Sequence, residues 1–204
     1  MASEELTLTP LSSLRVSRYL IPATGRIPNS SVASKPILLY HGAFTNASAT
    51  LIEAHLASVG AVTPQWRFTM YKTSHFHSTT HEVLCVSHGR AKLCFGGEGN
   101  PDRVELIVYH GDVMVLPAGV AHHLLEDLDG GFEMVGSYPP GHHWDMCYGK
   151  KDEGDVWNRI SNLAWFERDP VYGELGPALD VPRDSDAYLT GRRCEGIVGG
   201  DKEG

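Results

Sequence analysis

Three histidines and one glutamate stand at spacings that suit the binding of a metal cation. His75 and His77 are separated by one residue, and Glu82 follows after a short polar segment. Side chains two residues apart in a β-strand lie on the same face, so both imidazoles can approach one cation. We expect Glu82 to open the next strand and His122 to open a later one. Three neutral imidazoles and one carboxylate suit Fe, Mn, Ni, Co or Zn better than Ca or Mg, which prefer oxygen ligands.

The elements that position these residues are predicted to be short strands separated by turns. The chain has 204 residues, with 22 glycines and 12 prolines, and many of these stand between short apolar runs. The expected strands are 36–40, 67–72, 82–86, 91–95, 104–109, 113–116, 122–125 and 132–137. Many short strands at regular spacing are typical of an antiparallel sandwich or barrel.

Two helices are expected outside the strand block. Apolar residues recur at three- and four-residue steps over 47–59, where Asn46 or Ser48 can cap the start and Gly60 the end. A second helix is expected near 155–166. We predict an N-terminal extension over 1–35, a main domain over 36–178 with its core at 66–138, and a flexible tail over 179–204.

The segment around the first two histidines resembles the first sequence motif of the cupin superfamily, G-x5-H-x-H-x3,4-E-x6-G. His75, His77, Glu82 and Gly89 match this pattern, with four residues before the glutamate and six after it. Thr69 stands where the family has its leading glycine. That glycine is a frame position, so its loss does not affect the predicted ligands.

The segment that ends at the third histidine resembles the second cupin motif, G-x5-P-x-G-x2-H-x3-N. Gly111, Pro117, Gly119 and His122 match at the family's spacings, and Glu126 replaces the asparagine. Over roughly 36–178 the chain also looks like the single-domain YjlB-type cupins. The resemblance implies an all-β, RmlC-like antiparallel barrel or jelly roll with an N-terminal helix and a C-terminal extension. It also implies one metal inside the barrel, held by the four residues named above.

Three further residues are candidates for catalytic roles. If an unbroken strand leads to His75, Tyr71 and Arg67 face the pocket with it. Arg67 can then bind an anionic group bidentately, or it is a surface arginine. Tyr71 can donate a proton or fill space. His142 follows the last strand and belongs either to a lid with acid–base chemistry or to a solvated loop.

Two other histidines adjoin the predicted ligands. Alternation along a strand directs His81 and His123 to the opposite face from Glu82 and His122, so neither is included in the ligand set.

The overall composition excludes several classes of function. The formal net charge is −8, without a basic stripe, so we expect no nucleic-acid partner. No apolar run approaches the roughly 18 residues of a membrane span, and the N-terminus has no signal-like apolar core. The four cysteines lack CxxC spacing and are interpreted as free thiols, which favours a cytoplasmic location. The expected partner is a small-molecule substrate, and a homodimer follows only from the family's tendency.

The function that the resemblance implies is metal-dependent chemistry on a small molecule. Four protein ligands leave two positions of an octahedral ion for O2, water or substrate, so we expect a dioxygenase-like oxidoreductase. A non-redox isomerase or lyase, such as a decarboxylase, and a non-catalytic binding cupin stay open. The choice among these reactions rests on family analogy.

Overall fold

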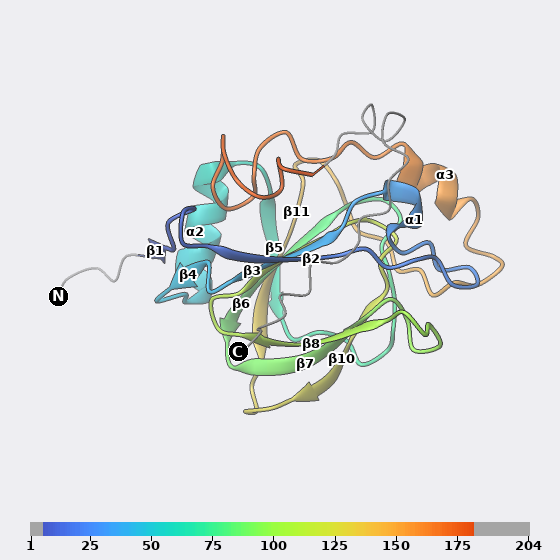
Figure 1. Ribbon diagram of the computed structural model, residues 1–204, viewed down its shortest axis with the longest axis horizontal. Coiled ribbons are helices and arrows are strands. Elements are labelled where there is room, and N and C mark those ends of the chain that lie inside the picture. The colour runs from blue at the N-terminus through green and yellow to red at the C-terminus, as the bar shows by residue number, and fades with distance from the viewer. Residues whose placement is uncertain (1–5, 182–204) are drawn as a thin grey trace, which may run out of the picture.

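Two antiparallel sheets pack against one another in the computed structural model, which describes residues 6–181 (Figure 1). The larger sheet has the order β2-β3-β9-β6-β11-β5, and the smaller has the order β10-β7-β8. The strands of the larger sheet are β2 (Arg15–Tyr19), β3 (Ile37–His41), β5 (Thr63–Phe68), β6 (Glu82–His88), β9 (Val113–Leu116) and β11 (Glu133–Tyr138). Those of the smaller sheet are β7 (Arg90–Phe95), β8 (Val104–Tyr109) and β10 (His122–Asp127).

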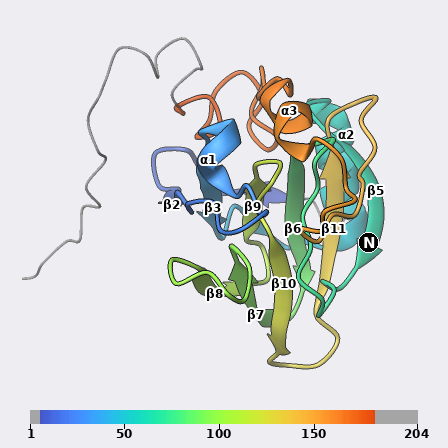
Figure 2. The same cartoon turned by 90° about the vertical axis from the view of Figure 1, so that its right-hand side faces the viewer.

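The remaining elements lie around these sheets. The strands β1 (Thr7–Leu8) and β4 (Phe44–Thr45) form a separate pair. The helices are α1 (Ser30–Ala33), α2 (Ala49–Val59) and α3 (Val156–Ser161). In Figure 2, α1 and α3 lie together at one end of the molecule, whereas α2 lies along the side at β5.

Strand β6 shows how the fold places a carboxylate inside the barrel. Its first six residues are all buried, because the larger sheet is covered on both faces. Leu84 and Val86 belong to the apolar core between the sheets, whereas Val83 and Cys85 pack on the other face, in the cluster that includes residues of α2. Because alternate side chains share a face, Glu82 lies on the interior side with Leu84.

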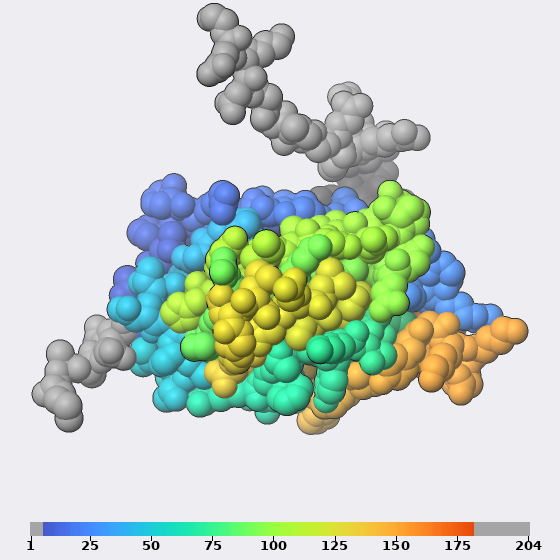
Figure 3. All heavy atoms as spheres, turned by 90° about the horizontal axis from the view of Figure 1, so that it is seen from below, coloured from blue at the N-terminus to red at the C-terminus, as the bar shows by residue number. Residues whose placement is uncertain are grey.

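Strand β10 uses the same alternation for a histidine. Leu124 belongs to the core between the sheets, so His122 shares its interior face, and His123 lies on the other one. Strand β10 pairs with β7, and Figure 3 shows the side of the molecule on which these strands are exposed to view.

Gly136 in β11 allows a tryptophan to lie directly over the strand. It pairs with Trp66 of β5, and a Cβ atom at Gly136 would stand 1.9 Å from the indole ring. The indole therefore occupies the space that any side chain at Gly136 would need. This close packing places the Trp66 ring beside Tyr138, two residues further along the same strand.

The all-β antiparallel fold class is confirmed, and strands 104–109 and 113–116 match their predicted bounds. The predicted strand 67–72 is wrong, because β5 runs over Thr63–Phe68. It lies at the sheet edge with β11 as its one partner, and Phe68 pairs with Met134 near the start of β11. Beyond Phe68 no partner strand continues, so the hydrogen-bonded ladder ends there.

The first predicted helix is confirmed over Ala49–Val59, with Ser48 accepting a hydrogen bond from the Leu51 amide and Gly60 closing the helix at φ 75°. The helix expected near 155–166 is shorter and ends at Ser161. Strand β2 lies within the predicted N-terminal extension and pairs with β3 of the main sheet. Of the predicted tail, residues 182–204 lie outside the described part of the chain.

Substitution of Gly136 tests the packing of Trp66. We expect Gly136→Ala to lower the free energy of unfolding by about 1–3 kcal/mol, since the new methyl group overlaps the indole ring. Urea denaturation measures the change. Gly99→Ala is the matched control, because a Cβ atom there meets nothing within 4 Å, and it should change stability by no more than about 0.5 kcal/mol. Equal losses in both variants would contradict the proposed contact.

Candidate metal centre

Two segments far apart in the sequence bring the three histidines together. His75 and His122 pair through their backbones, with the His122 amide donating to the His75 carbonyl at 2.8 Å and the reverse bond at 3.3 Å. Their ring centroids are 4.4 Å apart, and the His77 ring lies 5.4 Å from each of them. One nitrogen from each ring lies within 4.8 Å of the other two, and all three residues are buried. The predicted histidine cluster therefore exists as a compact group.

Backbone carbonyl groups fix the tautomer of each imidazole. The Nδ1 atoms of His75 and His122 donate to the carbonyls of Thr73 and Val120, both at 3.0 Å. The Nδ1 atom of His77 donates to the carbonyl of Asp145. A carbonyl oxygen only accepts, so the proton of each neutral ring is on Nδ1 and the Nε2 lone pair is available to a cation.

Glu82 approaches two of the three imidazoles. Its Oε1 atom lies 3.6 Å from Nε2 of His77, and its Oε2 atom lies 3.4 Å from Nε2 of His122. Oε1 also accepts a hydrogen bond from the Tyr138 hydroxyl at 2.8 Å. Oε2 is buried without a hydrogen-bond partner among residues 6–181. A carboxylate oxygen of this kind beside imidazole nitrogens is compatible with a divalent metal ion.

The pKa values of two ligands favour the charge states that a cation needs. Burial raises the pKa of Glu82, but His77, His122 and the Tyr138 hydroxyl outweigh it and lower the value to about 2. Burial is also the main reason why the pKa of His122 is lowered to about 3, with Glu82 opposing that shift. Near neutral pH, Glu82 is therefore an anion and His122 a neutral ligand.

The pKa values of His75 and His77 are shifted in opposite directions. Burial lowers the pKa of His75. Burial also lowers the pKa of His77, but Glu82 and the Asp145 carbonyl outweigh it, so the net shift is upward. His77 is thus the ligand at which a proton competes most strongly with a metal cation.

A short chain of hydrogen bonds, which no sequence motif indicates, supports the Glu82 carboxylate. Trp66 Nε1 donates to the Tyr138 hydroxyl at 2.8 Å, and that hydroxyl in turn donates to Glu82. Burial and the charge of Glu82 raise the pKa of Tyr138, so the phenol keeps its proton. The only sequence signal for this pair is that buried Trp and Tyr need polar partners.

Asp145 holds the segment that orients His77. Its carboxylate accepts from the Ser78 amide and the Ser78 hydroxyl, both at 2.6 Å, and from the Thr79 hydroxyl at 3.2 Å. Arg159 of α3 donates to the Ser78 hydroxyl at 2.8 Å. These bonds tie Asp145 to the segment after His77, and they hold the carbonyl that accepts from His77 in place. The sequence predicts either a lid or a solvated loop here, and it carries no signal for the contact between Asp145 and His77.

A cavity of about 240 Å³ opens above the histidine cluster. Its walls are mostly apolar and aromatic, with the four predicted ligands on one side. The lining residues are Trp66, Arg67, Phe68, Thr69, Met70, Tyr71, His75, His77, Glu82, Leu84, His122, Met134, Tyr138, Trp144 and Met146. This volume lies just below that of a typical drug-sized site, so the cavity suits a small molecule.

The catalytic candidates Tyr71 and Arg67 both border the cavity but make different contacts. Tyr71 lines the cavity, with its ring 5.6 Å from that of His75. Arg67 is predicted either to face the pocket or to be a surface arginine. It borders the cavity, but β5 ends at Phe68, so the continuous strand assumed to lead to His75 is wrong. The Arg67 guanidinium instead binds the Glu53 carboxylate of α2 through two contacts of 2.5 Å.

His142 lies outside the cavity lining. Its Nδ1 atom contacts the Thr79 carbonyl at 3.2 Å. His81 is buried against Trp165, and His123 lies 3.7 Å from Glu98. Neither of these two histidines lines the cavity, as the strand alternation predicted.

The chain is similar in sequence to a known protein family and to one known protein. A family model described as Cupin matches residues 71–127. The protein YjlB of Bacillus subtilis (strain 168) is 31% identical over 164 residues, which cover 80% of this chain and 94% of that protein. The chain belongs to the cupin family. This cupin is of the single-domain YjlB type, and the predicted family is confirmed.

The solved structures that match this cupin have a lower sequence identity to it than YjlB has. RmlC from Streptococcus suis is 13% identical, with 85% of this chain and 97% of that chain covered at a TM-score of 0.38. Procruciferin, an 11S globulin from Brassica napus, is 13% identical at a TM-score of 0.29, over 54% of this chain. The cupin spans about a fifth of procruciferin, 22% of its chain. Within residues 6–181, no helix has both the length and the apolar composition needed to cross a membrane.

Substitution of neighbouring histidines tests the cluster. We expect His122→Ala to lose most of the bound metal, because it removes an Nε2 ligand at the centre of the cluster. His123→Ala should keep the metal, since His123 is equally buried but faces Glu98. Elemental analysis of protein purified without chelator or nickel resin measures the stoichiometry. Full metal content in the His122 variant would mean that the ligand set is wrong.

Acidification tests the low pKa of His122. In the metal-free protein folded His122 stays neutral to about pH 3, whereas an exposed histidine protonates near pH 6.5. Between these values the unfolded state binds one more proton at this residue. The free energy of unfolding should therefore fall as the pH falls through this window, by up to about 1.4 kcal/mol per pH unit.

The variant His122→Gln is the comparison for this pH series, because it removes the titrating group and keeps a polar side chain. Its free energy of unfolding, measured by urea denaturation, should change less steeply between pH 6.5 and 4. His77, whose pKa is shifted upward, acts in the opposite direction in both proteins. Identical slopes for the two proteins would contradict the assignment.

Proposed function

We propose that this cupin is a metal-dependent enzyme that acts on a small molecule, with dioxygenase-like chemistry. The observation that carries the proposal is the orientation of three Nε2 lone pairs toward the floor of one cavity, beside a Glu82 oxygen that has no hydrogen-bond partner within residues 6–181. His75, His77, Glu82 and His122 would hold a divalent ion such as Fe or Mn. When bound, such an ion polarises a substrate oxygen and gives O2 a route to react.

The chain's own residues provide the surroundings for that chemistry. His77 and His122 keep the Glu82 carboxylate ionised, and the Tyr138 hydroxyl adds to this by donating to Oε1. Within residues 6–181 no hydrogen bond is made to Oε2, which can therefore face a ligand. Apolar side chains such as Leu84 and Met134 separate the floor of the cavity from water. Charges in such a poorly hydrated site interact more strongly than in solvent.

Two other functions use the same site. A non-redox isomerase or lyase would need the metal but no oxygen, and a binding module would need the pocket but no turnover. The cytoplasmic location also remains a proposal, supported by the free state of Cys85, Cys94 and Cys147. The homodimer stays a prediction from the family.

Oxygen consumption tests the proposed reaction class. The protein is loaded in turn with Fe(II), Mn(II) and Zn(II) and mixed with a panel of enol, phenol and thiol compounds, and dissolved O2 is recorded with an electrode. We expect O2 uptake with Fe(II) or Mn(II), none with Zn(II), and none for the His122→Ala variant. His123→Ala is the control that keeps the metal and should keep the uptake. Turnover that continues without oxygen would instead identify the isomerase or lyase.

A further inference from the structure

Three aromatic side chains remain half exposed where the cavity meets the solvent. Phe68, Tyr71 and Trp144 all line the cavity and are 51%, 52% and 43% exposed. The rings of Phe68 and Tyr71 are 5.7 Å apart, and the ring of Trp144 lies 6.0 Å from that of His77. Large apolar side chains grouped at the open end of a cavity are a feature of ligand-binding sites. We call these three residues the aromatic rim.

The backbone at the aromatic rim is held in place before any ligand binds. The carbonyl of His143, next to Trp144, accepts from the Thr79 hydroxyl at 2.7 Å, and Asp145 on the other side is fixed by Ser78. The carbonyl of Tyr71 accepts from the Leu124 amide of β10 at 2.9 Å. A ligand that contacts these rings therefore does not have to order the backbone that carries Tyr71 and Trp144.

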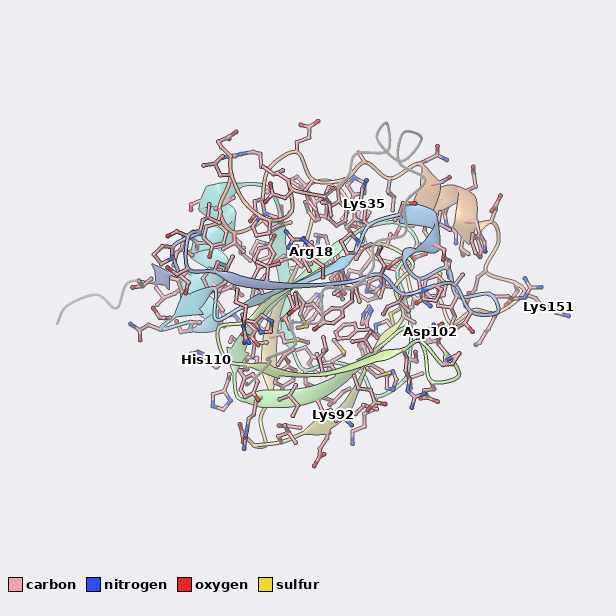
Figure 4. The ribbon with its side chains drawn as sticks, viewed as in Figure 1. Arg18, Lys35, Lys92, Asp102, His110 and Lys151 are labelled. Carbon is pink, nitrogen blue, oxygen red and sulfur yellow. The ribbon has the colours of Figure 1, made fainter. Side chains whose placement is uncertain are left out.

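Among its described lining residues, the cavity offers a charged ligand no positive side chain that is not already paired. Arg67 is the one lysine or arginine among its described lining residues, and its guanidinium is bound by Glu53 and by the Thr50 hydroxyl. Figure 4 shows Lys92 and Lys151 at the periphery of the molecule. An anionic group placed away from the histidine cluster would therefore lose water without gaining an ion pair.

The wall also contains uncharged polar groups, and one of them is buried without a partner in the described part of the chain. The hydroxyl oxygen of Thr69 is buried and has no hydrogen-bond partner among residues 6–181. It can hydrogen-bond to a neutral polar atom of a ligand. The walls therefore combine aromatic surface with a few neutral polar groups, and the residues that would hold a metal for oxygen donors lie only at the floor.

We propose that the substrate is a small single-ring aromatic compound that carries oxygen donors at one end and no charge at the other. The oxygen end faces the histidine cluster, and the ring packs against Tyr71 and Trp144. Contacts between aromatic rings favour such flat ligands over aliphatic ones of the same size. This inference rests on the proposed function, because the oxygen end needs the metal.

Hydroxamates test the ring and the metal separately. Acetohydroxamate and benzohydroxamate share one chelating group and differ in a methyl against a phenyl substituent. With Zn(II)-loaded protein, titration calorimetry should show benzohydroxamate binding roughly tenfold more tightly. A third probe, benzohydroxamate with a carboxylate in the para position, should lose most of that advantage because the cavity has no cation to receive it.

Substitutions in the aromatic rim locate the effect. In Trp144→Leu and Tyr71→Leu the advantage of benzohydroxamate over acetohydroxamate should fall to about threefold or less, with the affinity for acetohydroxamate unchanged. Trp157→Leu is the matched control, since Trp157 is 42% exposed on α3 but does not line the cavity. It should keep the full advantage.

The two proposals fail in different ways. Equal affinities for the two hydroxamates in the unsubstituted protein, or a ring advantage that persists in both rim variants, would overturn the aromatic assignment. Zn(II) loading and acetohydroxamate binding would still support the metal site in that case. Protein that binds neither Zn(II) nor acetohydroxamate would overturn the proposed function itself.

Discussion

The Glu82 carboxylate is a charged group buried in an apolar barrel, and its surroundings must offset the loss of water. Removing one carboxylate from water costs several kcal/mol unless partners replace the lost hydration. Here the partners come from several parts of the chain: Tyr138 from β11, His122 from β10, and His77 from the segment before β6. Trp66 from β5 holds the hydroxyl of Tyr138 in turn. The Glu82 carboxylate therefore stays ionised only where these strands and segments come together around it, and its charge in turn helps to hold them together.

The features that could be predicted from the sequence are those set by local spacing. Alternation along a strand is enough to place Glu82 with Leu84 and His122 with Leu124 on the interior face. The pair His75 and His77 is set by such a short spacing, whereas His122 lies 45 residues after His77 and was grouped with them through the resemblance to the second cupin motif. Helix α2 was also predictable, since its cap at Ser48 and its end at Gly60 are local signals.

The features that sequence could not predict depend on contacts between distant residues. Strand β5 ends at Phe68 because its partner β11 begins nearby, and this register is not visible in the residues around Arg67. Tyr138 and Asp145 support ligands that lie more than fifty residues earlier, at distances no pattern encodes. Strand β2 similarly joins the main sheet through pairing with β3, although its sequence has few apolar residues.

The segment around Asp145 serves two purposes at once. Its backbone orients His77, while its neighbours Trp144 and Met146 form part of the cavity wall. A mutation that moves the backbone of this segment also disturbs the support of His77, so only side-chain exchanges that keep the backbone in place, such as Trp144→Leu, change selectivity here without an epistatic cost. Phe68 lies on a different element and has no such link to a histidine ligand. Divergence of substrate preference among close relatives should therefore accumulate on the β5 side of the opening, where adaptive change is least constrained.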